Sequence, residues 1–598
     1  MEANKTLKKR EEIEEKYKWK LDKVYGNSKE WEKEFEELKV ESPVIKQFSG
    51  KLNDKEEILK YLELNEKISR KAEKLYVFAH MKSDEDTANQ SNQGFMNQID
   101  AFMAELGSYG AYFVPEILSL DEKFLIDLIK NDDRFKVYEF MIKDILKEKP
   151  HVLTKEMEEL LALASDCLDA SSNIHSMLTN ADMRFGKIPD EEGDLVELTE
   201  GNYSSFIKSK DRNVRKEAFN RLFGEYKKLE NTLATTLTSS IKSYNFSAKV
   251  RKYKSPLEAS LAPNDIPVSV YENSINTINE NLSSLHRYVR LKKKLLGLDE
   301  MHMYDLYVPV IEIDKENIPY VEAVNTANLA LKPLGEEYLN IFNEGIEKGW
   351  IDIYQNKGKR GGAYSFGGYD TMPYVLLNYN YELNDISTLV HEMGHSIHSY
   401  YSRKTQEYYY SGYTLFCAEV ASTTNEALLI HYLIDNESDQ KKKMFLINQE
   451  LEQIRTTVFR QLMFAEFELY THNALNDGLA LTASDYNDKW GELNQRYFGE
   501  DMIVDEALKT EWSRIPHFYS DYYVYQYATG YAAASAFAKS IINGEKDAVD
   551  KYKVFLKSGG SKYPIDILKD AGVDMTTSKP LEANIKRFNE LLDMIENN

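Results

Sequence analysis

The sequence predicts a mostly α-helical protein. In long segments, apolar residues recur at steps of three and four among Glu and Lys, which is the pattern of amphipathic helices. The 598 residues include only 14 prolines and 28 glycines, so few residues interrupt these segments. Residues 357–382 differ, because they open with glycines and end in an apolar and aromatic run typical of a strand. We therefore expect a helical fold with one small β-sheet.

The helical pattern is clearest in four segments, at residues 29–39, 155–170, 214–245 and 441–473. Between the second and the third, residues 185–202 combine glycine, proline and acidic side chains, a composition that interrupts helices. This break predicts a domain boundary. We expect a helical N-terminal domain over residues 1–200 and a second domain over residues 201–598 that carries the chemically informative motifs.

The composition excludes several classes of protein. There are 98 acidic against 75 basic side chains, so no basic excess is available to bind nucleic acid. Two cysteines, Cys167 and Cys417, cannot form a disulfide framework, which favours a reducing compartment. The N-terminus shows no secretory signal, and no run of about 18 apolar residues predicts a membrane span. We expect a cytoplasmic protein with no nucleic-acid or membrane partner.

The strongest chemical signal is His391-Glu392-Met393-Gly394-His395, an HExxH motif. Side chains at positions i and i+4 share one face of a helix, so His391 and His395 can hold one zinc ion. Glu392 lies about 100° around the same helix, within reach of a water molecule on that ion. The motif therefore predicts a zinc site with one ion per chain, ligated by His391 and His395, and a general base at Glu392.

The flanking residues support a helix at this motif. Asn384 or Asp385 can cap its start, and an apolar stripe opposite the histidines predicts its buried face. That stripe comprises Ile386, Leu389, Val390, Met393, Ile397 and Tyr400. Gly394 costs a helix about 1 kcal/mol relative to alanine, which indicates that another group approaches the backbone there. His398 lies one turn further on, and we interpret it as a neighbour of the zinc site, not a ligand.

Two histidines leave a zinc site one ligand short. The next helical pattern, residues 414–435, offers Glu419 and Glu426, which are seven residues apart and can face the same way. The spacing alone leaves the choice between them open. Cys417 and His431 are weaker candidates.

A tyrosine cluster follows near the C-terminus. Six of the thirteen residues from Tyr519 to Tyr531 are tyrosines, and His517 stands two residues before them. Phenol and imidazole groups can donate hydrogen bonds to an oxyanion that develops during attack on a carbonyl group. Most of these rings are expected to pack in the core, so only one or two are predicted to take part in chemistry.

The sequence resembles the oligoendopeptidase F group of the thimet oligopeptidase-like (M3) zinc metallopeptidases over nearly its full length. The segments that carry the resemblance include WKLDKVYGNSKEWEKEFEEL, DEDTANQSNQ, MLTNADMRFGKIPDEEG and RGGAYSFGGYDTMPYVLLNYN. They also include LVHEMGHSIHSYYS, FCAEVASTTNEALL and YYVYQYATGYAAASAF. Several of these segments lie outside the HExxH motif, so the resemblance is specific.

The resemblance implies a large helical ellipsoid with a deep substrate channel and a small sheet beside the zinc helix. The N-terminal domain would cover the channel, and residues 201–598 would form the catalytic domain. It implies Glu419 as the third zinc ligand, Glu426 as support for a ligand histidine, and no ligand role for His398. His517 matches a substrate-binding histidine, and a following tyrosine would stabilise the oxyanion. Tyr525 is preferred for that role, and Tyr522 is assigned to substrate binding.

The predicted reaction is hydrolysis of internal bonds in short, unfolded peptides. Zinc activates water and polarises the scissile carbonyl, while Glu392 moves the proton from the water to the leaving amine. The glycine-rich segment, with Gly362 and Ala363, is expected to bind the substrate backbone as an added strand. Two alternatives are a metallocarboxypeptidase on a related helical fold and a non-enzymatic peptide-binding protein with a structural zinc site.

Overall fold

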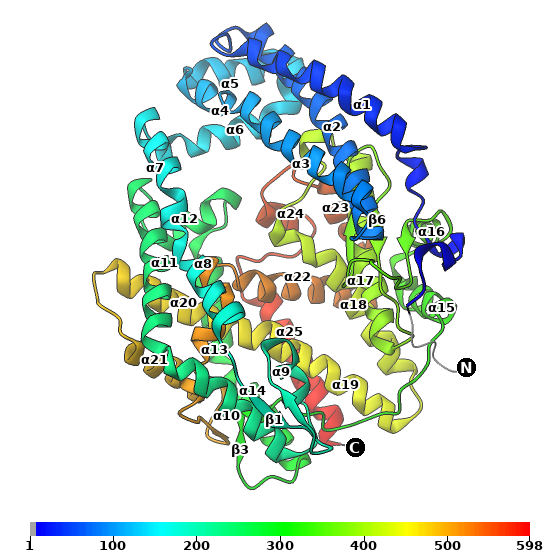
Figure 1. Cartoon of the computed structure of the whole chain (residues 1–598), viewed down its shortest axis with the longest axis vertical. Helices are drawn as coiled ribbons and strands as arrows, with labels where there is room; N and C mark the ends of the chain where they lie inside the picture. Colours follow the sequence, from blue (N-terminus) through cyan, green and yellow to red (C-terminus); the bar gives the residue numbers. More distant parts are fainter. Residues whose placement is uncertain (1–6, 598) are drawn as a thin grey trace. The chain divides into compact units, whose positions relative to one another are not determined.

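The computed structural model describes residues 7–597 and confirms the predicted, mostly helical fold (Figure 1). Contacts between residues divide the chain into two units, each assembled from three separate segments. Unit 1 contains residues 7–150, 315–432 and 537–572, and unit 2 contains residues 151–314, 433–536 and 573–597. The boundary predicted near residue 200 falls inside the first segment of unit 2.

Unit 1 is mostly helical and contains one small three-stranded sheet. Its helices are α1 (Ser28–Glu41), α2 (Lys55–Glu85), α3 (Gln90–Gly110), α4 (Phe113–Ser119), α5 (Glu122–Asn131), α6 (Glu139–Glu148), α15 (Tyr320–Leu331), α16 (Glu336–Glu347), α17 (Leu383–Thr405), α23 (Ala548–Ser558) and α24 (Pro564–Asp570). Its strands are β4 (Ile351–Asp352), β5 (Tyr364–Phe366) and β6 (Tyr374–Leu376). Helices α18 (Leu415–Asn436) and α22 (Tyr525–Ile542) contribute residues to both units.

Unit 2 is also helical. Its helices are α7 (Lys155–Leu168), α8 (Ala170–Ser176), α9 (Glu200–Phe206), α10 (Arg212–Lys228), α11 (Glu230–Val250), α12 (Pro256–Leu261), α13 (Val268–Glu280), α14 (Leu282–Leu295), α19 (Gln440–Ile454), α20 (Arg460–Asn476), α21 (Ala483–Phe498) and α25 (Lys579–Glu596). Strands β1 (Lys187–Pro189) and β2 (Leu195–Glu197) pair antiparallel, and β3 (Met301–His302) pairs parallel with β7 (Met502–Ile503). Across residues 7–597, no helix is both long and apolar enough to cross a membrane.

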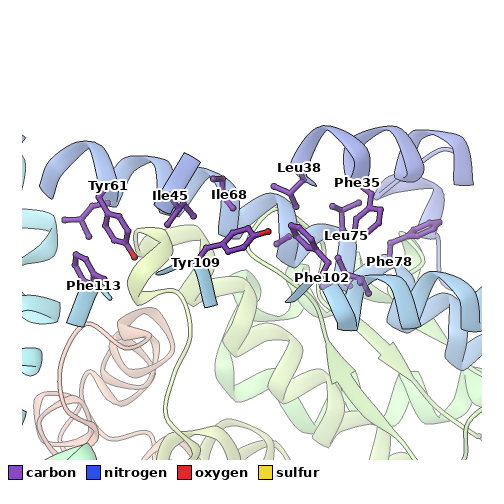
Figure 2. Close-up of a cluster of buried hydrophobic side chains, with 14 of the residues drawn as sticks. Phe35, Leu38, Ile45, Tyr61, Ile68, Leu75, Phe78, Phe102, Tyr109 and Phe113 are labelled. Atoms are coloured by element: carbon purple, nitrogen blue, oxygen red, sulfur yellow. The ribbon is translucent and has the colours of Figure 1, made fainter. Parts of the chain in front are cut away.

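The first helices of unit 1 begin at side-chain caps and share one core. Asn27, Asp54 and Asn89 accept hydrogen bonds from the first backbone N–H groups of α1, α2 and α3, which have no partners within the helix. Figure 2 shows the core that these helices form, in which Phe35, Leu75 and Phe102 come from three different helices. Burial of such large apolar side chains is the main force that holds the helices together.

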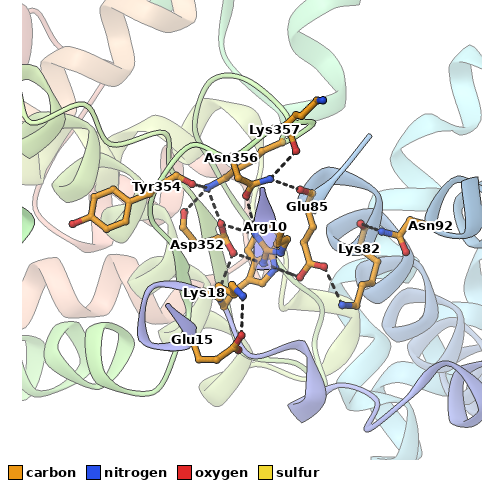
Figure 3. Close-up of polar contacts among 12 residues, drawn as sticks. Arg10, Glu15, Lys18, Lys82, Glu85, Asn92, Asp352, Tyr354, Asn356 and Lys357 are labelled. Carbon is orange, nitrogen blue, oxygen red and sulfur yellow. Dashed lines mark hydrogen bonds and ion pairs between the residues drawn. The ribbon is translucent and has the colours of Figure 1, made fainter. Parts of the chain in front are cut away.

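A buried polar network joins the start of the chain to α2 and β4 (Figure 3). Asp352 is 1% exposed, and its carboxylate lies 2.6 Å from Arg10 Nη2 and 2.7 Å from Lys359 Nζ. Glu85 accepts hydrogen bonds from Arg10 Nη2 at 3.0 Å and from Trp19 Nε1 at 2.8 Å. Burial by itself raises the pKa of Asp352, but Lys359 and Arg10 outweigh it and hold that pKa below its usual value. The carboxylate is therefore ionised and paired.

Replacing Asp352 by Asn is expected to destabilise unit 1 by about 3 kcal/mol, because it leaves the buried charges of Arg10 and Lys359 short of a counter-ion. The measurement is the melting temperature followed by circular dichroism, which should fall by several degrees. The exposed Asp22→Asn is the control and should melt like the wild type. Adding Lys359→Met to Asp352→Asn should recover part of the loss, because it removes one unpaired charge. An unchanged melting temperature in Asp352→Asn would contradict the structural role of the network.

The small sheet of unit 1 has the strand order β4-β6-β5. Strand β4 pairs parallel with β6, while β5 pairs antiparallel with it, with Ser365 opposite Val375. Tyr374, Val375 and Leu376 of the central strand are fully buried. Strand β5 lies against α17, where the Ser365 and Ser396 hydroxyls are 2.8 Å apart. This position confirms the predicted sheet beside the helix of the HExxH motif.

Candidate metal centre

Helix α17 carries the HExxH motif and starts slightly earlier than predicted. It begins at Leu383, and the carboxylate of Asp385 accepts hydrogen bonds from the backbone N–H groups of Asn380 at 2.8 Å and Glu382 at 2.9 Å. Asp385 thus caps the helix from within its first turn, because its side chain can reach back to the preceding residues.

The predicted apolar stripe of α17 is buried. Ile386, Leu389, Val390, Met393 and Ile397 are each at most 2% exposed, and Tyr400 is half-buried. His391 and His395 are half-buried, so their rings remain accessible while the helix is anchored by its other face. The helix therefore holds the two imidazoles on a fixed backbone.

Glu419 of α18 completes a three-residue cluster with these histidines. The two Nε2 atoms are 3.2 Å apart, and Oε2 of Glu419 lies 3.5 Å from each of them. A tetrahedral zinc ion with bonds of about 2.0–2.1 Å separates its ligand atoms by about 3.3–3.4 Å. Within residues 7–597, no other cluster of His, Cys, Asp and Glu has such metal-ligand spacing. These three residues fit a metal ion.

Glu426, the other glutamate that the spacing left open, lies at the far side of the same imidazole. Its Oε1 is 3.4 Å from Nδ1 of His391 and accepts a hydrogen bond from Ser387 Oγ at 3.3 Å. A carboxylate on the outer nitrogen of a ligand histidine fixes the ring orientation and leaves Nε2 free to bind metal. About two turns of α18 separate these two glutamates, so both lie on the side of the helix that faces His391.

The charges of the cluster influence one another strongly. Burial lowers the pKa of His391, but Glu426, Glu392 and Glu419 outweigh it and raise that pKa to about 9. Burial raises the pKa of Glu419, but the histidines, with His395 first, lower it to about 2. Glu419 is thus an ionised carboxylate, as a metal ligand must be.

Glu392, the predicted general base, is 7% exposed and lies between the two histidines in sequence. Burial raises its pKa above the usual value, although His391 and His395 act in the opposite direction. Such a shift moves a carboxylate toward the range in which it both accepts and returns a proton at neutral pH.

Gly394 lies where α18 crosses α17. A β-carbon at this position would be 2.6 Å from the Cα atom of Ser422 and 3.0 Å from the carbonyl oxygen of Ala421. The amide of Asn425 donates a hydrogen bond to Val390 O at 2.9 Å across the same crossing. The close approach inferred from the glycine in the sequence is therefore that of α18, the helix that carries Glu419.

The remaining candidates near the motif lie outside the cluster. His398 is 1% exposed and stacks on Tyr413 at a ring distance of 3.7 Å, and burial lowers its pKa to about 3. Cys417 is 2% exposed, and burial raises the pKa of its thiol to about 12. His431 also does not belong to the three-residue cluster.

His517, Tyr522 and Tyr525 belong to unit 2. His517 is exposed, and its ring stacks with Tyr523 at 6.1 Å. Tyr522 is fully buried with a positive φ of 56°, and its hydroxyl has no hydrogen-bond partner among the described residues. Tyr525 begins α22 and is 2% exposed. Their assignment to substrate binding and oxyanion stabilisation stays a prediction.

Gly362 and Ala363 immediately precede β5 in unit 1. Gly362 has a positive φ of 82°, and its carbonyl oxygen accepts a hydrogen bond from Asn378 Nδ2 at 2.7 Å. In the described chain β5 is an edge strand, because it pairs with β6 alone. Its other edge has the geometry to which an extended peptide can add.

The residues of α2 that support β5 were not among the residues predicted from the sequence. Asp84 and His80 of α2 contact this strand, although about 280 residues separate them from it. Nothing in a helical pattern marks one acidic residue among many as a partner of a distant strand, so no local signal could have identified them.

Comparison with known proteins places the chain in a family. The model of "Peptidase family M3" matches residues 205–587, and that of "Oligopeptidase F" matches residues 116–185. Two histidines and a glutamate are a ligand set that metal-dependent peptidases use. Here a mostly helical fold carries these three residues. The chain belongs to peptidase family M3 and is a peptidase.

Similar proteins cover nearly the whole chain. Oligopeptidase PepF of Bacillus subtilis is 47% identical over 588 residues, which are 98% of this chain and 88% of the relative. Group B oligopeptidase PepB of Streptococcus agalactiae is 41% identical over 98% of both chains. Among solved structures, oligoendopeptidase-F from Enterococcus faecium is 38% identical with a TM-score of 0.73, covering 96% of this chain and all of that one. A protein from Chlamydophila abortus is 34% identical with a TM-score of 0.95, covering 99% of this chain and 100% of that one.

Proposed function

We propose that this peptidase is a zinc-dependent endopeptidase that hydrolyses internal bonds of short, unfolded peptides. The observation that carries the proposal is the convergence of His391 Nε2, His395 Nε2 and Glu419 Oε2 at mutual distances of 3.2–3.5 Å. Glu392 lies on the same helix, and a purely structural zinc site has no use for such a base. The oligopeptidase names of the relatives support short peptides as substrates.

The residues divide the work of hydrolysis between them. His391, His395 and Glu419 would hold the zinc ion, which would lower the pKa of a bound water molecule toward about 7 and polarise the scissile carbonyl. Glu392 accepts the proton of the attacking water and delivers a proton to the leaving amine. Glu426 keeps the His391 ring oriented through Nδ1. His517 and Tyr525 are the proposed donors to the oxyanion.

The edge of β5 is the proposed binding site for the substrate backbone. A peptide that adds to this edge gains main-chain hydrogen bonds that do not depend on its sequence. Such binding suits an enzyme that cuts many different peptides. Gly362 and Ala363 lie where the strand begins, and glycine leaves room for the substrate to approach.

The test is cleavage of a quenched fluorescent peptide whose C-terminus is blocked. We expect cleavage at an internal bond, complete loss of activity after chelation and recovery when stoichiometric zinc is added. Metal analysis should find one zinc per chain in wild type and none in the chelated protein. Failure to cut the blocked peptide while releasing residues from a free C-terminus would favour a metallocarboxypeptidase. Bound zinc with no hydrolysis of either peptide would favour a peptide-binding protein.

A further inference from the structure

Strand β5 is held from both of its faces. Side chains alternate along a strand, so Ser365 points one way while Tyr364 and Phe366 point the other. The Ser365 hydroxyl meets Ser396 of α17 at 2.8 Å, next to the metal ligand His395. Tyr364 and Phe366 contact α2, where the ring of Phe366 lies 4.9 Å from that of His80. The distance between the substrate-binding edge and the HExxH helix is therefore set by both contacts.

Asp84 is the polar anchor on the α2 side. Its side chain is 4% exposed, and its Oδ2 accepts a hydrogen bond from the Tyr364 hydroxyl at 2.7 Å. Its Oδ1 lies 3.3 Å from Nη1 of Arg360, and its backbone carbonyl accepts from the Arg360 N–H at 3.0 Å. Nε2 of His80, one turn earlier on α2, is 3.3 Å from the same carboxylate. The buried Asp84 carboxylate thus holds two residues, Arg360 before β5 and Tyr364 at its start.

The residues between Arg360 and Tyr364 have little support of their own. A β-carbon on Gly361 or Gly362 would meet nothing within 4 Å, and Gly362 adopts a backbone conformation that other residues rarely use. Asn378 adds hydrogen bonds to the carbonyl oxygens of Arg360 at 3.0 Å and Gly362 at 2.7 Å. The shape of this glycine segment therefore depends on Asn378 and on the residues that fix its two ends.

We propose that Asp84 is a positioning residue. It holds the first residue of β5 in the position that brings a peptide bound along the free edge of this strand within reach of Glu392. The inference rests on the proposed function, because it assumes that substrate adds to this edge. Asp84 acts through Tyr364 and Arg360 and touches neither substrate nor metal. An edge that is ordered before binding saves the peptide the entropic cost of ordering it. Loss of the anchor should therefore weaken peptide binding first.

Binding is measured by calorimetry in the Glu392→Gln background, where a peptide is held without being cut. Asp84→Ala is expected to raise the Kd about tenfold, the loss that follows when a buried hydrogen bond to a charged group is removed. Tyr364→Phe removes only the hydroxyl and is expected to raise it several-fold. The double variant should be no weaker than Asp84→Ala alone, because both changes break the same contact.

Cleavage assays with Glu392 intact provide the second measurement. KM is expected to rise about tenfold in Asp84→Ala while kcat stays within about twofold, since the loss is in binding shared by substrate and transition state. Asp84→Asn keeps an acceptor for Tyr364 and should recover part of the affinity. Asp127→Asn, an exposed aspartate on α5, is the control and should match the wild type in both assays.

Two results would overturn the inference. The first is an unchanged Kd and KM in both Asp84→Ala and Tyr364→Phe, with normal zinc content. The second is a fall in zinc content or melting temperature that accounts for all lost activity, with additive effects in the double variant. If Asp84→Ala does not fold, Tyr364→Phe decides, because it changes a single hydroxyl. Failure of the proposed function is separate, since it would appear as wild-type protein that does not cut a blocked peptide.

Discussion

Glu392→Gln is expected to keep its zinc and lose hydrolysis by a factor of about 10²–10⁴, the usual contribution of a general base. Glutamine has nearly the same shape as glutamate but cannot accept a proton. Glu392 is not a member of the three-residue ligand cluster, so its replacement leaves His391, His395 and Glu419 in place. The measurements are kcat/KM on a quenched peptide and zinc content on the same preparation.

Two further variants make this result specific. Glu419→Gln should lose zinc and activity together, because it removes a metal ligand. Glu407→Gln, an exposed glutamate just after α17, should keep both. If Glu392→Gln cleaves peptides at a rate near that of wild type, the assignment of the base is wrong. If it loses zinc, Glu392 has a part in holding the metal that the geometry does not indicate.

The pairing of His391 with His395 could be predicted from the sequence because it is a local contact. Helix geometry places residues i and i+4 together, so the HExxH spacing alone brings His391 and His395 to one face. The apolar stripe of α17 could be predicted for the same reason, and it is buried as expected. His398, which we expect to be a neighbour of the site and not a ligand, lies outside the cluster and is enclosed against Tyr413, because a second face of the helix is also covered.

The choice between Glu419 and Glu426 marks the limit of local reasoning. Seven residues are about two helical turns, so both carboxylates face the same way and the spacing cannot separate them. In the structure, Glu419 meets the two Nε2 atoms and Glu426 meets Nδ1 of one ring. That difference depends on where α18 crosses α17, which is a tertiary feature.

Contacts over long sequence distances could not be predicted at all. Asp352 pairs with Arg10, and Asp84 pairs with Tyr364, across about 340 and 280 residues. Each unit also draws together three separate segments of the chain, whereas composition suggested one boundary near residue 200. A charged residue in a helical pattern is usually solvated, so nothing in the sequence distinguishes the few that are buried and paired.

Gly394 lies on the helix of the HExxH motif at the point where α18 crosses it. Gly394→Ala is therefore expected to disrupt the metal centre. The new β-carbon would meet the backbone of Ser422 at 2.6 Å, a distance that side-chain rotation cannot relieve. Relief requires α18 to move away from α17, and Glu419 moves with it. We expect a destabilisation of about 3 kcal/mol from overpacking, which exceeds the gain of about 1 kcal/mol in helix propensity.

The substitution should affect zinc affinity more strongly than it affects the overall stability of the protein. A metal site requires its ligands within about 0.5 Å of their positions, so a shift of α18 should lower zinc affinity about 100-fold or more. The measurements are zinc affinity by competition with a chelating dye, kcat/KM at limiting zinc, and the melting temperature of the metal-free protein. Gly107→Ala is the matched control, because Gly107 is an exposed helical glycine of α3 with open space around it. That variant should bind zinc normally and melt slightly higher, and equal behaviour of the two variants would show that the crossing tolerates a side chain.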